Sequence, residues 1–129
     1  MQTHEKLITV TLDDLDQLHH VNNVRYVQWV QDIAEEHWQA KVTPEITDAY
    51  FWVLLKHSIE YKNPALLGDV ILLKTFILKS EGVTSLRKVE MYDNASGKLL
   101  VASETTWCLI SKTNLKPARI TPEISELFS

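Results

Sequence analysis

The segment from Asp13 to Trp38 most constrains how this chain folds, because a carboxylate-rich polar turn runs directly into a long amphipathic segment. Apolar side chains recur three to four residues apart, which predicts one helix over roughly residues 22–41 with a single buried stripe. The predicted stripe consists of Tyr26, Val27, Val30, Ile33, Ala34 and Trp38. Asn22 or Asn23 is a suitable N-cap. Unpaired backbone N–H groups at the helix start then lie beside the carboxylates of the turn, and we expect chemistry there.

One strand is predicted before this helix and four after it. Alternating or β-branched segments place these strands at residues 6–12, 50–61, 70–79, 83–92 and 99–110. Short turns join the last four strands, so neighbours in sequence are expected to pair antiparallel. The order predicts an α+β domain in which one long helix packs on a five-stranded antiparallel sheet. Long edge strands have to be covered or paired, and self-association is one way to do so.

The overall composition limits the possible partners. A chain of 129 residues predicts a single domain over residues 1–129. The net charge is −4 and no basic run occurs, which argues against nucleic acid and against an anionic membrane as partners. No segment approaches the roughly 20 apolar residues of a membrane span, and the start of the chain lacks a signal-peptide profile. We therefore expect a cytoplasmic protein.

Cysteine, glycine and histidine usage argues against a bound cofactor or metal. Cys108 is the only cysteine, so no intrachain disulfide or thiolate metal cluster is expected. The three glycines, at positions 68, 82 and 97, do not form a P-loop, a dinucleotide-binding fingerprint or a nucleophile elbow. The five histidines include no His-Glu-x-x-His motif. We expect neither a cofactor nor a metal.

The predicted helix start carries a recognisable motif, Asp-x-x-x-His-Val-Asn-Asn-x-x-Tyr, over residues 16–26. This motif resembles that of the hot-dog-fold acyl thioesterases, including the 4-hydroxybenzoyl-CoA thioesterase group. It is most similar to the plant acyl-ACP thioesterases. The likeness continues through residues 59–69 and 107–117, and so covers nearly the whole chain.

The resemblance implies a hot-dog fold, in which a five-stranded antiparallel sheet wraps around one central helix. It also implies a homodimer or homotetramer with the acyl-thioester site between protomers. The implied reaction is hydrolysis of an acyl-CoA or acyl-ACP thioester to a free acid and a thiol, without metal or cofactor.

Three residues are the candidates for catalysis. Asp16 is expected to act as general base on water, or as the nucleophile, unless it only stabilises the turn. In relatives of the 4-hydroxybenzoyl-CoA thioesterase group the donor to the oxyanion lies seven residues past the aspartate, which corresponds to Asn23 at the helix start. His20 either orients Asp16 or contacts the thioester, or is only a hydrogen-bonded residue of the turn.

Four further residues are candidates for substrate binding: Asn22, Tyr26, Trp29 and Glu60. Asn22 also fits a capping role, and Tyr26 also fits the core. Helical spacing places Trp29 off the predicted stripe, where its side chain is expected to seal an interface or an acyl pocket. Glu60 faces either the site or the solvent.

Two departures from the relatives affect the mechanism. His19 occupies a position that is commonly Gly in relatives. In the plant enzymes an Asn and a Glu-Cys pair share in catalysis, whereas this chain has Leu18, Pro64 and Ala65 at those places. Hydrolysis is therefore expected to use a simpler arrangement built on Asp16.

Two alternative functions remain open from the sequence. One is a non-catalytic module for acyl-thioester binding or assembly. The other is a hot-dog hydratase or dehydratase, although the His-Phe-Pro-type motif of the dehydratases is absent.

Overall fold

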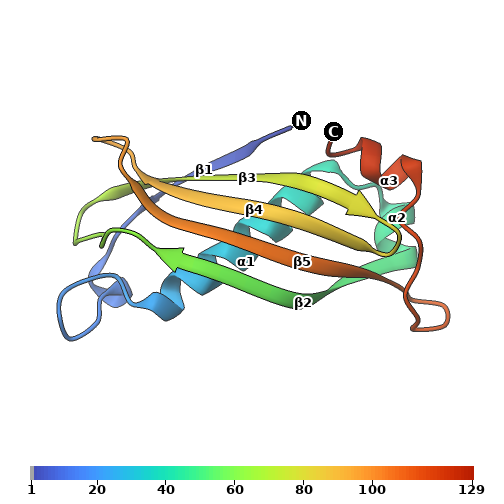
Figure 1. Ribbon diagram of the computed structural model, residues 1–129, viewed down its shortest axis with the longest axis horizontal. Helices are drawn as coiled ribbons and strands as arrows, with labels where there is room; N and C mark the ends of the chain where they lie inside the picture. The colour runs from blue at the N-terminus through green and yellow to red at the C-terminus, as the bar shows by residue number, and fades with distance from the viewer. Residues whose placement is uncertain (1) are drawn as a thin grey trace.

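The computed structural model describes residues 2–129 as one curved antiparallel sheet wrapped around one long helix (Figure 1). In chain order the elements are β1 (His4–Thr9), a 3-10 turn (Leu12–Asp14), α1 (Asn23–Lys41), α2 (Pro44–Ala49), β2 (Tyr50–Tyr61), β3 (Val70–Glu81), β4 (Thr84–Asp93), β5 (Leu99–Ser111) and α3 (Pro122–Glu126). The sheet order is β1-β3-β4-β5-β2, and every pair is antiparallel. The predicted α+β architecture is confirmed. The expected pairing of β2 with its neighbour in sequence, β3, is wrong, because the chain between them crosses to the other side of the sheet and β2 pairs with β5.

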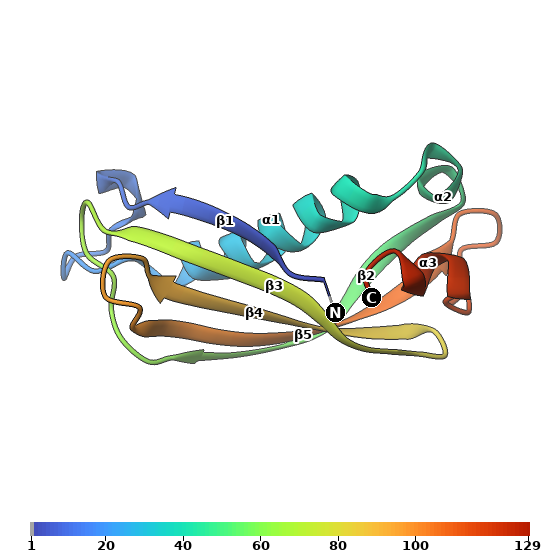
Figure 2. The ribbon, with the colours of Figure 1, turned by 90° about the horizontal axis from the view of Figure 1, so that it is seen from above.

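The central helix α1 buries a wider surface than its sequence pattern predicts. Its buried residues are Tyr26, Trp29, Val30, Ile33, Ala34 and His37. They form two adjacent ridges of side chains four residues apart, because the curved sheet covers more than one face of the helix (Figure 2). Trp29 is only 7% exposed, so its predicted position off the buried stripe is wrong.

Most predicted strand limits agree with the structure, and β2 agrees at both ends. The first strand is the exception, because it ends at Thr9 rather than at residue 12. Beyond it the Asp14 carboxylate accepts hydrogen bonds from the backbone N–H and the hydroxyl of Thr11. These bonds turn the chain out of the sheet. The hairpin turn predicted before β5 is present, with Gly97 at a φ of +75°.

The inner face of the sheet changes in character along its length. Beneath the first half of α1 it is apolar, with Ile71, Leu73, Met91, Val101 and Val89 fully buried. Further along the same strands comes a group of buried polar side chains: Thr75, Ser85, Arg87, Ser103 and Thr105. Arg87 and Thr105 lie directly opposite each other across β4 and β5, and Thr105 lies opposite His57 of β2. A polar row therefore crosses the sheet beneath the second half of α1.

The outer strand β2 has a free edge in the described chain, because it pairs only with β5. It is twelve residues long and carries the exposed apolar side chains of Val53, Leu55 and Tyr61. A long exposed edge of this kind is suited to pairing with another strand. Within residues 2–129, no helix has both the length and the apolar character needed to cross a membrane.

Candidate active site

The turn that precedes α1 is organised around the Asp16 carboxylate. Its Oδ1 accepts hydrogen bonds from the backbone N–H groups of Leu18, at 2.8 Å, and of His20, at 3.2 Å. The Asp16 backbone N–H donates to the His20 carbonyl at 2.8 Å. Oδ2 has no hydrogen-bond partner within residues 2–129, and the residue is half-buried. One carboxylate oxygen thus fixes the turn while the other is free for a ligand.

The same turn contains a backbone conformation that favours glycine. His19 has a φ of +61°, and its side chain is exposed. An L-residue in this left-handed region carries a cost of about 1 kcal/mol. Glycine, the residue that the resemblance implies at this position, would adopt this conformation without that cost.

Contacts from two sides hold the turn in place. Arg25, in the first turn of α1, forms an ion pair from Nε to Oδ1 of Asp14 at 3.0 Å. On the other side, the Val21 backbone N–H donates to the Ala65 carbonyl at 3.0 Å. The Ala65 N–H in turn donates to the Tyr26 hydroxyl at 3.2 Å. The loop after β2 and the start of α1 therefore fix the backbone around Asp16 together.

The start of α1 retains an unpaired backbone donor. Of the two predicted candidates, Asn22 is the N-cap, and its side chain accepts a hydrogen bond from the Val24 N–H at 3.0 Å. The Asn23 backbone N–H finds no acceptor within residues 2–129. It lies at the positive end of the helix dipole, where a developing negative charge is stabilised.

The expected catalytic residues lie together, since Asp16, His20 and Asn23 belong to one continuous turn and helix start. His20 is half-buried, and it contacts Asp16 through its backbone N–H and carbonyl. No hydrogen bond joins the His20 ring to the Asp16 carboxylate in the described chain.

The expected substrate-binding residues are more scattered. Tyr26 is buried and lies edge-on to Trp29 with 5.6 Å between ring centroids, which places both rings in the core. Burial raises the pKa of the Tyr26 hydroxyl. Glu60 is exposed and pairs with the Lys62 ammonium at 2.8 Å, a hydrogen bond that lowers the pKa of the Glu60 carboxyl.

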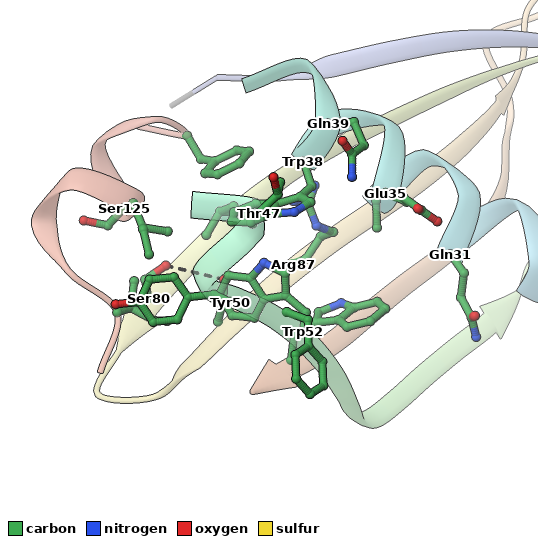
Figure 3. A pocket seen from close by; sticks show the side chains of 18 of the residues that line it. Gln31, Glu35, Trp38, Gln39, Thr47, Tyr50, Trp52, Ser80, Arg87 and Ser125 are labelled. Carbon is green, nitrogen blue, oxygen red and sulfur yellow. Dashed lines mark hydrogen bonds between the residues drawn. The ribbon is translucent and has the colours of Figure 1, made fainter. Parts of the chain in front are cut away.

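A cavity of about 420 Å³ lies at the opposite end of α1 from the Asp16 turn. Figure 3 shows this cavity from close by. Its walls include Trp38, Thr47, Tyr50, Trp52, Arg87 and Trp107. Trp38 and Trp52 meet edge-on with 5.6 Å between centroids. No predicted site residue lines this cavity, so the cavity and the expected chemistry are at different ends of the protomer.

Two charged or titratable residues in this region were missed from the sequence. Arg87 is 5% exposed, His37 is 1% exposed, and the Arg87 Nη1 lies 2.9 Å from the His37 Nδ1. The sequence did contain a signal for Arg87. Ser85, Arg87, Val89 and Met91 alternate along β4, so the arginine shares the inward-facing phase of a strand whose other inward residues are small or apolar.

No group of three or more His, Cys, Asp and Glu side chains suited to a metal ion occurs in the described part of the chain. Cys108 is buried with a free thiol.

Comparison with known families gives a match over residues 1–128 to the model of the acyl-ACP thioesterase N-terminal domain. A search of curated protein sequences gives no significant match.

Comparison with solved structures supports the hot-dog fold. The 1,4-dihydroxy-2-naphthoyl-CoA thioesterase from Synechocystis has a TM-score of 0.84 at 20% identity, covering 98% of this chain and 95% of that one. The protein SAV2348 from Staphylococcus aureus, solved in complex with CoA, has a TM-score of 0.86 at 17% identity, covering 98% and 81%. The 12:0-ACP thioesterase from Umbellularia californica has a TM-score of 0.85 at 14% identity; the match covers 98% of this chain but 51% of that one.

Proposed function

Because the chain belongs to the acyl-ACP thioesterase family of hot-dog-fold thioester hydrolases, we propose that it hydrolyses an acyl-CoA or acyl-ACP thioester to a free acid and a thiol. The observation that carries this proposal is the Asp16 carboxylate, held by one oxygen and open at the other, immediately before the start of α1. Such a group can act on water or on the thioester carbonyl.

Asp16 is the proposed working carboxylate. Two backbone N–H groups fix the Oδ1 oxygen, which orients Oδ2 at no further cost when a substrate arrives. Oδ2 either accepts a proton from the attacking water or attacks the carbonyl carbon to form a mixed anhydride, which water then hydrolyses. His20 supports this geometry through its backbone.

The Asn23 N–H is the proposed oxyanion donor. It is unpaired within the described chain, whereas the next N–H is capped by the Asn22 side chain. A donor that already points away from the helix needs no rearrangement when charge develops on the thioester oxygen.

The cavity is proposed to receive the acyl group of a substrate attacked by the partner protomer. Asn23 and Trp38 are fifteen positions apart on α1, or about 22 Å at 1.5 Å per residue, too far for a short acyl group to bridge within one protomer. The Asp16 turn lies at the Tyr61 end of β2, since the Tyr61 and Tyr26 rings are 5.8 Å apart. The cavity lies at the opposite end of β2, at Tyr50.

Antiparallel pairing of two β2 edges brings these two ends together. A two-fold axis near the middle of β2 places the Tyr61 end of one strand beside the Tyr50 end of the other. The turn of one protomer then faces the cavity of its partner, twice per dimer. We propose this homodimer as the active unit, with further association into a homotetramer left open.

The carrier is proposed to be coenzyme A or an acyl carrier protein. The plant-type Glu-Cys pair is replaced here by Pro64 and Ala65, and Ala65 is fully buried with its backbone bonded to Val21 and Tyr26. These positions support the Asp16 turn and supply no reactive side chain.

The cytoplasmic location expected from the sequence stays a prediction.

The test is thiol release from short-chain, long-chain and aromatic acyl-CoAs by the wild type and by Asp16→Asn. The amide oxygen of the replacement still accepts the two backbone hydrogen bonds, so the fold is retained while the carboxylate is lost. We expect kcat to fall by roughly 10²- to 10⁴-fold on every substrate.

Asp13→Asn is the matched control, because Asp13 is an exposed carboxylate in the same segment. It is expected to retain full turnover. If no acyl-CoA reacts, the same variants are assayed on acyl-ACPs. Unchanged turnover in Asp16→Asn contradicts the assignment of Asp16, and silence of the wild type on both carriers contradicts the proposed function.

A further inference from the structure

Arg87 is a buried positive charge on the wall of the aromatic cavity. It projects from the inner face of β4, is 5% exposed, and lines the cavity together with Trp38 and Trp52 (Figure 3). Burial lowers the pKa of its guanidinium from 12.5 to about 10, so it remains protonated at neutral pH. A buried charge is stable only when it is paired or well hydrogen-bonded.

The protein supplies Arg87 with neutral partners only. Its Nη1 donates to the Thr75 hydroxyl at 2.9 Å and contacts the His37 Nδ1 at 2.9 Å. Burial, and then the nearby Arg87, lower the pKa of His37 to about 4, so its Nδ1 is an acceptor at neutral pH. Within residues 2–129 no carboxylate lies within 4.0 Å of the guanidinium.

The unused part of the guanidinium has the shape of a carboxylate-binding fork. Both hydrogens of Nη1 are directed at Thr75 and His37, whereas Nε and Nη2 make no hydrogen bond in the described chain. These two nitrogens present parallel N–H groups that match the two oxygens of a carboxylate. The cavity around the guanidinium has aromatic walls and a polar surface at the sheet, where Ser85 is also buried.

We propose that this cavity binds an acyl group whose far end carries a carboxylate, and that Arg87 is the residue that selects it. The apolar part of the chain packs against the tryptophan walls, and the terminal carboxylate supplies the missing counter-charge to the fork. This inference deepens the proposed function and rests on it, because it names the substrate class as ω-carboxyacyl thioesters. Arg87 here determines specificity and takes no part in bond breaking.

Binding of a matched pair of small molecules tests the fork without requiring turnover. Octanoate and octanamide have the same shape and differ in charge. Calorimetry on the wild type is expected to show octanoate bound about 10- to 100-fold more tightly, as befits a charge-assisted bidentate contact. In Arg87→Gln and in Arg87→Met, which has a similar volume, the two affinities are expected to become equal within error.

Lys88→Gln is the control for charge, since Lys88 is the next residue of β4 and lies on its opposite face. It is expected to keep the preference for octanoate. Equal affinities in the wild type, no binding of either molecule, or a preference that survives in both Arg87 variants would overturn the proposal.

Turnover then tests the substrate class. The wild type is expected to hydrolyse suberoyl-CoA with a kcat/KM about 10- to 100-fold above that of octanoyl-CoA, and Arg87→Gln to lose this ratio through KM. Failure of the wild type on all thioesters contradicts the proposed function. Turnover of octanoyl-CoA without any preference for suberoyl-CoA contradicts only the role of Arg87.

Discussion

The two ends of α1 are built in opposite ways. At the start of the helix, backbone hydrogen bonds, an ion pair and an apolar core fix a short turn and leave one carboxylate oxygen free. At the far end, aromatic side chains from α1, β2 and β5 surround a cavity with a buried guanidinium and a polar floor.

This contrast separates two requirements of catalysis. Chemistry needs groups held rigidly in place, whereas recognition of a substrate needs open volume with a few well-placed polar groups. In the function proposed above, the turn would meet the first requirement and the cavity the second. Their separation along α1 makes sense when each active site combines the turn of one protomer with the cavity of another.

Three variants probe the two ends of α1 separately. The variant that fills the cavity is expected to have the largest effect. Thr47, on α2, is half-buried at the cavity wall, so Thr47→Trp adds an indole there without enlarging the close-packed core. Each CH₂ kept out of an apolar pocket forfeits about 0.8 kcal/mol, so kcat/KM for long acyl-CoAs should fall roughly 100-fold. Thiol-release kinetics with acyl-CoAs of different chain lengths measure this fall in kcat/KM. Equal losses on acetyl-CoA and on long chains would show that the cavity does not hold the acyl group.

Removing the buried imidazole is expected to change the pH dependence of stability at the cavity end. The pKa of His37 is about 4 in the fold, against an ordinary value of 6.5, so the unfolded chain binds more protons between these pH values. Stability should therefore rise with pH across this window, by about 2–3 kcal/mol, and be fully present above pH 6.5.

His37→Gln, whose amide oxygen still accepts from Arg87, should flatten this slope. Urea unfolding between pH 4 and 7.5 measures how the free energy of unfolding depends on pH. His57, whose pKa burial also lowers, contributes a smaller slope of the same sign, so His57→Gln serves as the comparison. An unaltered slope in His37→Gln would contradict the assignment of this pH dependence to His37.

Relieving the backbone at the Asp16 turn is expected to have the smallest effect. His19 has a positive φ, so His19→Gly removes a cost of about 1 kcal/mol but makes the unfolded chain more flexible. We expect a net gain in the free energy of unfolding below about 1 kcal/mol, measured by urea denaturation. His19→Ala keeps the unfavourable backbone conformation, so its free energy of unfolding should not increase. A loss of stability in His19→Gly would show that the His19 side chain is needed in the turn.

The sequence predicted the parts of the molecule that depend on local patterns. The central helix, its Asn22 cap, the limits of β2 and the glycine turn before β5 all follow from periodicity, capping and turn chemistry. The motif singled out the turn around Asp16, and the structure shows this turn fixed by hydrogen bonds to the Asp16 carboxylate; the catalytic role of Asp16 stays a prediction.

The features that were missed depend on how far the sheet curves around the helix. Trp29 was placed outside the buried stripe because a single stripe assumes a flat neighbour, whereas the wrapped sheet also buries the adjacent ridge with His37. Nothing local to β4 reveals that the inward-facing Arg87 meets a histidine of α1 and a threonine of β3 beside a cavity. Such contacts bring together residues far apart in the sequence.

Mixing two inactive variants tests directly whether each active site combines the Asp16 turn of one protomer with the cavity of its partner. Asp16→Asn and Thr47→Trp are unfolded together, refolded as a mixture and assayed on a long acyl-CoA. If sites are shared, half of the dimers are mixed and each has one intact site, so activity should recover to roughly one quarter of wild type. If both halves of a site lie within one protomer, every site keeps a defect and the mixture stays inactive, which would contradict the account.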